Sequence, residues 1–229
     1  MNPRFATAQV PGELFRVGRR PDLWRWADRQ YTGSERWDDP RGEFRVLYAS
    51  LSRLGAFLEV LAPLRPDPAL RAGLRAVRSN DRGAPKTAPA GRVPARWRYE
   101  RIAGRGIPDE VEGALVVIGA SESIAMLRRR MGRAARRHGL TDIDAAAIRL
   151  TAPRGFTQEV SRFIFEQVAE GGTRYGGIVY LSKHGDDVVD CAIFERGDAF
   201  PVHSTERMSI AADDEDFLTA CEMLGLVTG

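Results

Sequence analysis

Apolar positions near the start of the chain fall into short continuous runs and one run with helical spacing. Residues 14–17 and 44–48 are runs of the first kind, and they predict two strands separated by a mostly polar loop. Over residues 53–61, large apolar side chains recur at intervals of three and four, which predicts a helix with one apolar face. Ser50 or Ser52 is placed to cap its first turn.

The same alternation continues in the middle of the chain. Residues 111–118 predict a buried strand, and the turn that follows leads into a helix running to His138. Gly139 is the expected end of this helix, because glycine readily adopts the left-handed conformation found after helix termini. Residues 145–150 form another short apolar run, which predicts a strand.

The last third of the chain contains a strongly amphipathic segment at residues 157–170, which predicts a helix. Residues 177–181 and 188–194 predict two strands joined by a turn. The acidic run at residues 213–216 suits the start of a helix, and residues 217–224 predict that helix.

Residues 65–105 have a different character from their surroundings. They are rich in Pro, Gly and Arg, so we interpret them as an insert or variable region. The alternation of strands and helices outside this region predicts a mixed α/β (α+β) fold in a single domain over residues 1–229.

The composition narrows the class of protein. Hydrophobic residues make up 43 % of the 229 residues, enough for a core, and the formal net charge of +3 does not indicate specific nucleic-acid binding. Cys191 and Cys221 form no metal-binding motif, so we expect no metal, with two buried thiols favoured over one disulfide. The N-terminal residues lack the apolar core of a signal peptide, and no apolar run is long enough to span a bilayer. We therefore expect a cytoplasmic protein without membrane contact.

Four short segments follow one another along the chain in an order that is typical of one protein family, although no single segment is specific for it. They are Leu14-Phe15-Arg16-Val17; Glu35-Arg36-Trp37-Asp38-Asp39-Pro40 with Val46-Leu47-Tyr48; Ala56-Phe57-Leu58-Glu59-Val60; and residues 175–184 with Ala192-Ile193-Phe194-Glu195. Together they resemble the RES-domain family, whose name records an Arg, a Glu and a Ser, and Thr157-Gln158 resembles a further family feature. The sequence departs from the family pattern at Ser34-Glu35, at Gly176 and at Lys183.

The resemblance implies a fold like that of the ADP-ribosyltransferases, with NAD as the substrate. Family members studied as toxins of toxin–antitoxin pairs degrade NAD, some with inorganic phosphate as acceptor. An Xre-like antitoxin protein holds them inactive. A toxin of this kind that cleaves the nicotinamide N-glycosidic bond, as NAD phosphorylase or NAD glycohydrolase, is the leading expectation.

Arg16 and Arg36 are the expected binding residues for the pyrophosphate of NAD. A guanidinium group can hold a phosphate through two parallel hydrogen bonds. Composition alone would place both among the solvated surface arginines, and the resemblance favours the binding role. By the same resemblance, the neighbouring Trp37 is assigned to NAD binding.

Glu59 and Tyr48 are the expected contacts to the nicotinamide end. Departure of nicotinamide leaves positive charge on the ribose, which a carboxylate such as Glu59 would stabilise. The pattern alone would make Glu59 an exposed position on an amphipathic helix. Tyr48 offers a ring to stack on nicotinamide and a hydroxyl for a ribose or phosphate oxygen, and its alternative is a half-buried strand tyrosine.

Ser182 and His184 follow a predicted strand. The hydroxyl of Ser182 can bond the ribose or the carboxamide of NAD, so Arg36, Glu59 and Ser182 are the expected catalytic set. His184 is a weaker candidate of the same kind. The alternatives are a serine that caps the turn and an ordinary loop histidine.

Two other motifs favour structural roles. Residues 119–123 resemble a nucleophile elbow but end in Ser123 where glycine is required, so we interpret Ser121 as a helix cap. The basic run at residues 127–138 is typical of a solvated helix face, although it could also meet nucleic acid or an acidic partner.

Two alternatives to NAD degradation remain open. The first is an ADP-ribosyltransferase that modifies a protein and shares the site. The second is a non-catalytic nucleotide-binding or interaction module. The sequence is compatible with a homo-oligomer and does not identify the acceptor.

Overall fold

The computed structural model describes residues 4–66, 91–108, 111–150, 152, 154–169, 172, 174–197 and 201–229. Within these residues, eight strands form one sheet in the order β1-β6-β7-β8-β3-β2-β5-β9. Their bounds are β1 (Thr7–Ala8), β2 (Leu14–Arg19), β3 (Val46–Ser50), β5 (Arg101–Pro108), β6 (Leu115–Val117), β7 (Gly177–Leu181), β8 (Val189–Phe194) and β9 (Val202–Ser209). β6 and β7 pair in parallel, and the other neighbours in this sheet pair antiparallel.

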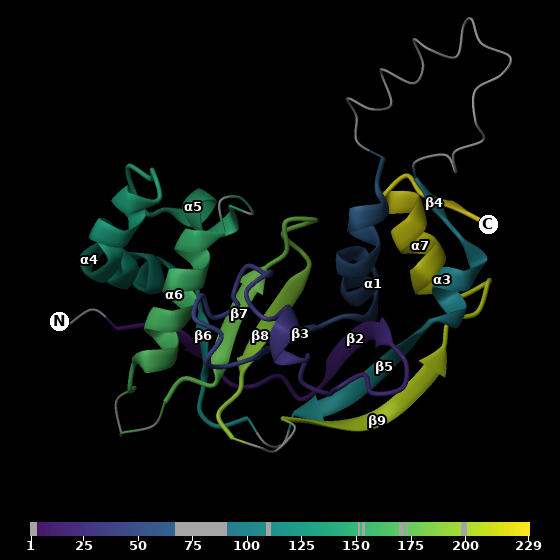
Figure 1. Ribbon diagram of the computed structural model, residues 1–229, viewed down its shortest axis with the longest axis horizontal. Coiled ribbons are helices and arrows are strands. Elements are labelled where there is room, and N and C mark those ends of the chain that lie inside the picture. The colour runs from purple at the N-terminus through teal and green to yellow at the C-terminus, as the bar shows by residue number, and fades with distance from the viewer. Residues whose placement is uncertain are drawn as a thin grey trace, which may run out of the picture.

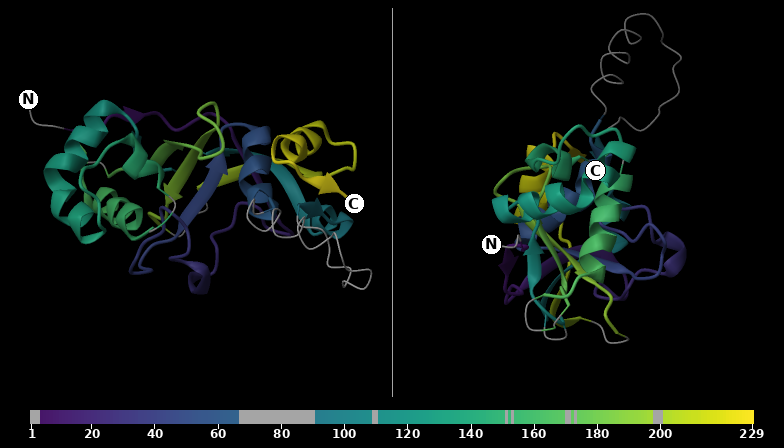
Figure 2. Two further views of the ribbon diagram at one scale, coloured as in Figure 1. Left: turned by 90° about the horizontal axis from the view of Figure 1, so that it is seen from above. Right: turned by 90° about the vertical axis from the view of Figure 1, so that its left-hand side faces the viewer.

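The helices gather at the two ends of this sheet, with the central strands between them (Figure 1). At one end lie α4 (Ser121–Arg137), α5 (Ala145–Arg149) and α6 (Gly155–Glu166), and at the other lie α1 (Arg53–Leu61), α3 (Ala95–Tyr99) and α7 (Glu215–Met223). Figure 2 shows the same separation from above. The short helices η1 (Arg29–Tyr31) and η2 (Ala62–Leu64) and the parallel pair of β4 (Arg92–Val93) and β10 (Val227–Thr228) complete the described elements.

Each group of helices covers its own part of the hydrophobic core. The α4–α6 end packs Leu127, Val160 and Ile164 against strand residues such as Ile178, and all four are fully buried or nearly so. At the α1–α7 end, the rings of Phe57 and Phe217 meet edge to face at 5.9 Å. Burial of such side chains contributes about 1.5–3 kcal/mol each. The two cores fix the helices on either side of the central strands.

The mixed α/β class is confirmed, and most predicted elements are present. The helix at Arg53–Leu61 has its predicted bounds, and Ser52 is its cap, since the Ser52 hydroxyl accepts a hydrogen bond from the backbone N–H of Gly55 at 3.0 Å. Gly139 has a φ of 77° directly after the end of α4, as the sequence predicted.

The strand predicted at residues 145–150 is wrong, because this segment is helix α5. Asp144 caps it by accepting a hydrogen bond from the N–H of Ala147 at 2.7 Å. Three consecutive alanines then favour the helix, and apolar spacing over so short a run does not distinguish the two structures. The cap proposed for α4 also differs, since Ala120 occupies the cap position and Ser121 is the first helical residue.

The region at residues 65–105 contributes to the main sheet where it is described. Residues 91–105 include β4, α3 and the first part of β5, and β5 lies between β2 and β9. The sequence interpretation found neither β5 nor β9. Residues 67–90, the remainder of the predicted insert after Pro66, lie outside the described residues.

Candidate functional site

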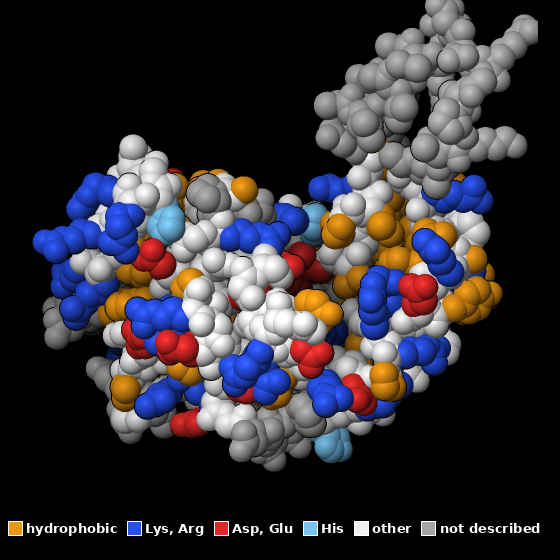
Figure 3. Space-filling model, in the orientation of Figure 1, with side chains coloured by type: hydrophobic (Ala, Val, Ile, Leu, Met, Phe, Trp, Pro, Cys, Tyr) orange, Lys and Arg blue, Asp and Glu red, His pale blue; other side chains and the backbone are white. Residues whose placement is uncertain are grey.

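A cavity of about 350 Å³ lies between α1 and the central strands β2, β3, β7 and β8. Arg16, Arg36, Tyr48 and Glu59, four of the residues predicted from the sequence, line it. Figure 3 shows acidic side chains at the bottom of a hollow between the two helical ends of the molecule. The sheet order explains the convergence, because β7, β8, β3 and β2 are neighbours.

Arg36 lies in the loop between η1 and β3, and it presents its guanidinium group to this cavity. The guanidinium carbon is 4.4 Å from the ring centre of Tyr180 and 4.9 Å from that of Trp37. Stacking on aromatic faces stabilises a cation and leaves the N–H groups at its edge available. Among the described residues, Arg36 makes no hydrogen bond or ion pair, so these donors can bind an anion.

Asp38, a residue of the loop that carries Arg36, stabilises this loop through hydrogen bonds. One oxygen of this buried carboxylate accepts hydrogen bonds from the backbone N–H groups of Gly33 and Glu35, both at 2.9 Å. The other oxygen accepts the hydroxyl of Tyr48 at 2.9 Å. These contacts tie the loop to β3.

Helix α6 also binds this loop through hydrogen bonds to its backbone. The side-chain amide of Gln158 donates hydrogen bonds to the backbone carbonyl groups of Gly33 and Glu35 at 2.8 and 2.9 Å. The hydroxyl of Ser161 donates to the backbone carbonyl oxygen of Trp37 at 2.6 Å. Of the pair Thr157-Gln158, which resembled a family feature, Gln158 therefore anchors the Arg36 loop.

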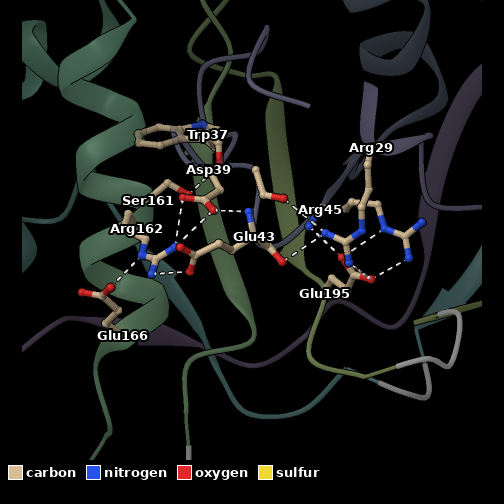
Figure 4. Close-up of polar contacts among 10 residues, drawn as sticks. Arg29, Trp37, Asp39, Glu43, Arg45, Ser161, Arg162, Glu166 and Glu195 are labelled. Carbon is tan, nitrogen blue, oxygen red and sulfur yellow. Dashed lines mark hydrogen bonds and ion pairs between the residues drawn. The ribbon is translucent and has the colours of Figure 1, made fainter. Parts of the chain in front are cut away.

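An ion network continues this anchorage past Trp37 (Figure 4). Arg162 of α6 contacts the fully buried carboxylate of Asp39 at 3.2 Å and also pairs with Glu43 and Glu166, both at 2.6 Å. Charges that are buried and paired on several sides hold a fixed geometry better than exposed pairs. The segment that follows Arg36 is thus fixed to α6.

Arg16 enters the cavity wall from β2. Its guanidinium donates to the carbonyl oxygen of Leu23 at 2.8 Å, and burial lowers its pKa to about 10. The group therefore remains a cation at neutral pH. Among the described residues no carboxylate pairs with Arg16, so its charge is available to a ligand.

Tyr48 and Trp37 have structural partners. The hydroxyl of Tyr48 donates to Asp38 and accepts the backbone N–H of Trp37 at 3.0 Å. Burial, followed by the charge of Asp38, raises the pKa of Tyr48 well above its usual value. The Trp37 side chain is fully buried beside the Tyr180 ring and does not line the cavity. Both residues support the Arg36 loop, and of the two only Tyr48 faces the cavity.

Glu59 projects from α1 with its side chain 35 % exposed, and it meets Ser182 at the end of β7. The Ser182 hydroxyl donates to one Glu59 oxygen and accepts the backbone N–H of His184 at 3.0 Å. Nε2 of His184 lies 4.0 Å from the other Glu59 oxygen, and burial lowers the pKa of this histidine, which keeps it neutral at neutral pH. Ser182 thus holds one oxygen of the Glu59 carboxylate, and neither Ser182 nor His184 lines the cavity.

Asp190 on β8 is a cavity-lining residue that the sequence interpretation missed. Its side chain is almost fully buried, with 1 % of the residue exposed. Burial, followed by the charge of Glu59, raises its pKa to about 8. The sequence could have indicated this residue, because Asp190 is a single carboxylate within the apolar strand segment at residues 188–194.

Charged side chains at the rim complete the cavity. Glu35 and Arg154 form an ion pair at 3.3 Å, and burial raises the pKa of Glu35. Lys183 also lines the cavity. Within the part of the chain that the structure describes, no three His, Cys, Asp or Glu side chains are placed to hold a metal ion. In the same residues, no helix is both long and apolar enough to cross a membrane.

The charges are arranged so that one ligand can meet opposite groups. Arg16 and Arg36 supply cations, and Glu59 with Asp190 supplies carboxyl groups to the same cavity. Such a site suits a molecule that carries anionic groups at one end and hydroxyl groups or developing positive charge at the other.

One protein-family model and one solved structure are similar to this chain. No curated protein matches the chain. A crystal structure described as the M. tuberculosis MbcT–MbcA toxin–antitoxin complex is similar at 12 % sequence identity, over 96 % of this chain and 92 % of that chain, with a TM-score of 0.48. The family model described as the RES domain matches residues 13–217. The chain therefore belongs to the RES domain family.

Proposed function

We propose that this protein degrades NAD by breaking the bond between nicotinamide and the ribose C1′ carbon. The observation that supports this best is that one cavity contains both the Glu59 carboxylate, held by Ser182, and the guanidinium of Arg36, which makes no hydrogen bond or ion pair among the described residues. NAD has the complementary groups: a diphosphate, and a ribose that gains positive charge as nicotinamide leaves. Membership of the RES family supports the same substrate.

Each side chain has a defined task in this proposal. Arg36 and Arg16 bind the diphosphate, and Glu59 lies against the ribose of the nicotinamide half. The C1′–N bond breaks and its electron pair passes to the ring nitrogen, so nicotinamide leaves as a neutral molecule. The Glu59 carboxylate stabilises the charge that develops on the ribose. An oxygen of water or inorganic phosphate then bonds to C1′, and water loses one proton in doing so.

A toxin role follows from the family resemblance. NAD loss would stop growth, so the proposal includes a protein antitoxin of the Xre-like kind that blocks the enzyme in the cytoplasm. The proposal requires neither a metal ion nor nucleic acid.

The test is to incubate the purified protein with NAD, with and without inorganic phosphate, and to identify the products. We expect free nicotinamide in equal amount to the NAD consumed. A phosphorylated ADP-ribose product would identify phosphorolysis, and free ADP-ribose would identify hydrolysis. Arg36→Ala should raise the KM for NAD at least about tenfold, because the diphosphate loses a charged partner. An intact NAD pool under both conditions contradicts the proposal.

A further inference from the structure

A second cavity of about 280 Å³ shares two of its lining residues, Arg36 and Tyr180, with the first. It extends to the other side of these residues, between the ends of β6 and β7 and the short helix α5. Most of its walls are apolar side chains from the strand region and from α5, namely Val117, Ile118, Val179 and Leu181, and Ala145 and Ile148.

These walls suit a flat, weakly polar ring system. The named side chains are all apolar, and the lining residue Gly119 is so open that a side-chain carbon added to it would meet nothing within 4 Å. Arg149 is the only other charged lining residue besides Arg36, and it is paired with Asp186 at 2.8 Å. Ligand sites commonly combine apolar walls with a few polar groups that fix orientation.

Arg36 stands between the two cavities, and its position determines how they can be used together. Its guanidinium stacks on Tyr180, has no hydrogen bond or ion pair among the described residues, and faces both spaces. A dinucleotide has the same order of groups, since two nucleosides flank a diphosphate. The carboxyl groups of Glu59 and Asp190 belong to the first cavity alone, so that cavity is the one suited to the reacting ribose.

We propose that the second cavity binds the adenosine half of NAD while Arg36 holds the diphosphate between the halves. This inference rests on the proposed function and deepens it, because it assigns the part of the substrate that does not react. Binding of a remote group contributes free energy that a truncated substrate lacks. Nicotinamide mononucleotide has the same scissile bond without adenosine, and it should therefore be the poorer substrate.

Ala145 and Ala146 provide a matched pair of variants. Both are exposed near the start of α5, and only Ala145 lines the second cavity. Ala145→Trp should obstruct the cavity without disturbing the core, and Ala146→Trp adds the same side chain outside it. Unfolding temperatures of both variants should match that of the wild type.

The experiment measures kcat/KM for NAD and for nicotinamide mononucleotide in the three proteins. We expect the wild type to prefer NAD. Ala145→Trp should lower kcat/KM for NAD at least about tenfold and change kcat/KM for nicotinamide mononucleotide less than about twofold. Ala146→Trp should resemble the wild type. Equal use of both substrates by the wild type, or an unchanged value for NAD in Ala145→Trp, would overturn the inference and leave NAD degradation intact.

Calorimetric titration with AMP gives a readout that does not need turnover. We expect the wild type to bind AMP and Ala145→Trp to bind it at least about tenfold more weakly. Absence of nicotinamide release from either substrate would overturn the proposed function, whereas absence of AMP binding by the wild type would overturn the adenosine subsite.

Discussion

Asp190 shows how burial gives an ordinary side chain an unusual property. Its carboxyl group lies on β8 and lines the cavity, and burial, followed by the charge of Glu59, raises its pKa to about 8. At neutral pH this carboxyl group is therefore mostly protonated. A protonated Asp190 adds no negative charge beside Glu59 in the cavity.

The raised pKa makes a prediction about stability. In the unfolded chain Asp190 loses its proton near its ordinary pKa of 3.8, whereas in the folded protein it keeps the proton up to about pH 8. The unfolded state therefore binds fewer protons in this window, and the free energy of unfolding should fall as pH rises through it. Asp190→Asn cannot ionise, so its stability relative to the wild type should rise by about 1–3 kcal/mol between about pH 5 and pH 8.

Urea denaturation at several pH values measures this difference. Asp213→Asn is the control, because Asp213 is exposed near the start of α7. A difference between Asp190→Asn and the wild type that does not change with pH would show that Asp190 is ionised in the folded protein throughout.

At the scale of elements, helix α6 holds the loop that carries Arg36, which has no helix or strand of its own at that residue. Gln158 and Ser161 bond three backbone carbonyl groups of that loop, and Arg162 pairs with Asp39 beyond it. The sequence predicted the helix from its apolar face and predicted Arg36 from the family resemblance. It did not predict that polar residues on α6 would join the two, because contacts between segments over 120 residues apart follow from tertiary packing.

Removal of this anchor should affect substrate binding more than folding. Gln158→Ala loses two hydrogen bonds to the loop, so we expect the KM for NAD to rise about tenfold, with kcat changed less than about threefold. Gln167→Ala, at the end of the same helix, is the matched control. Steady-state kinetics with both variants checks the prediction, and it fails if Gln158→Ala lowers the unfolding temperature while the KM stays at the wild-type value.

The elements also show which sequence signals are dependable. Helically spaced apolar positions predicted α1 and α6, and short apolar runs predicted strands β2, β3, β7 and β8. These elements build the cavity and the anchor of the Arg36 loop. The short segment α5 was mistaken for a strand, since its Asp144 cap outweighed a run of apolar residues. Strand β9 was missed because five of its eight residues are exposed and polar, which hides the apolar pattern of a sheet edge.

At the scale of the whole molecule, the central strands lie between two groups of helices, and the cavity lies between α1 and these strands. Helix α1, held to α7 at one end, supplies Glu59, and the loop held by α6 at the other end supplies Arg36. The fold thus brings together residues that are distant in sequence. The family resemblance predicted Arg16, Arg36 and Glu59, whereas Asp190 and the second cavity became visible only once the strands were paired.

The central claim is that Glu59 acts on NAD in this cavity, and the most direct measurement is the initial rate of nicotinamide release from NAD. Glu59→Gln keeps the size of the side chain and removes its charge, so we expect the rate to fall at least about 100-fold. Glu222→Gln, at an exposed position of α7, should leave the rate unchanged. Nicotinamide release by Glu59→Gln at the wild-type rate, from a protein that is folded, would contradict the claim.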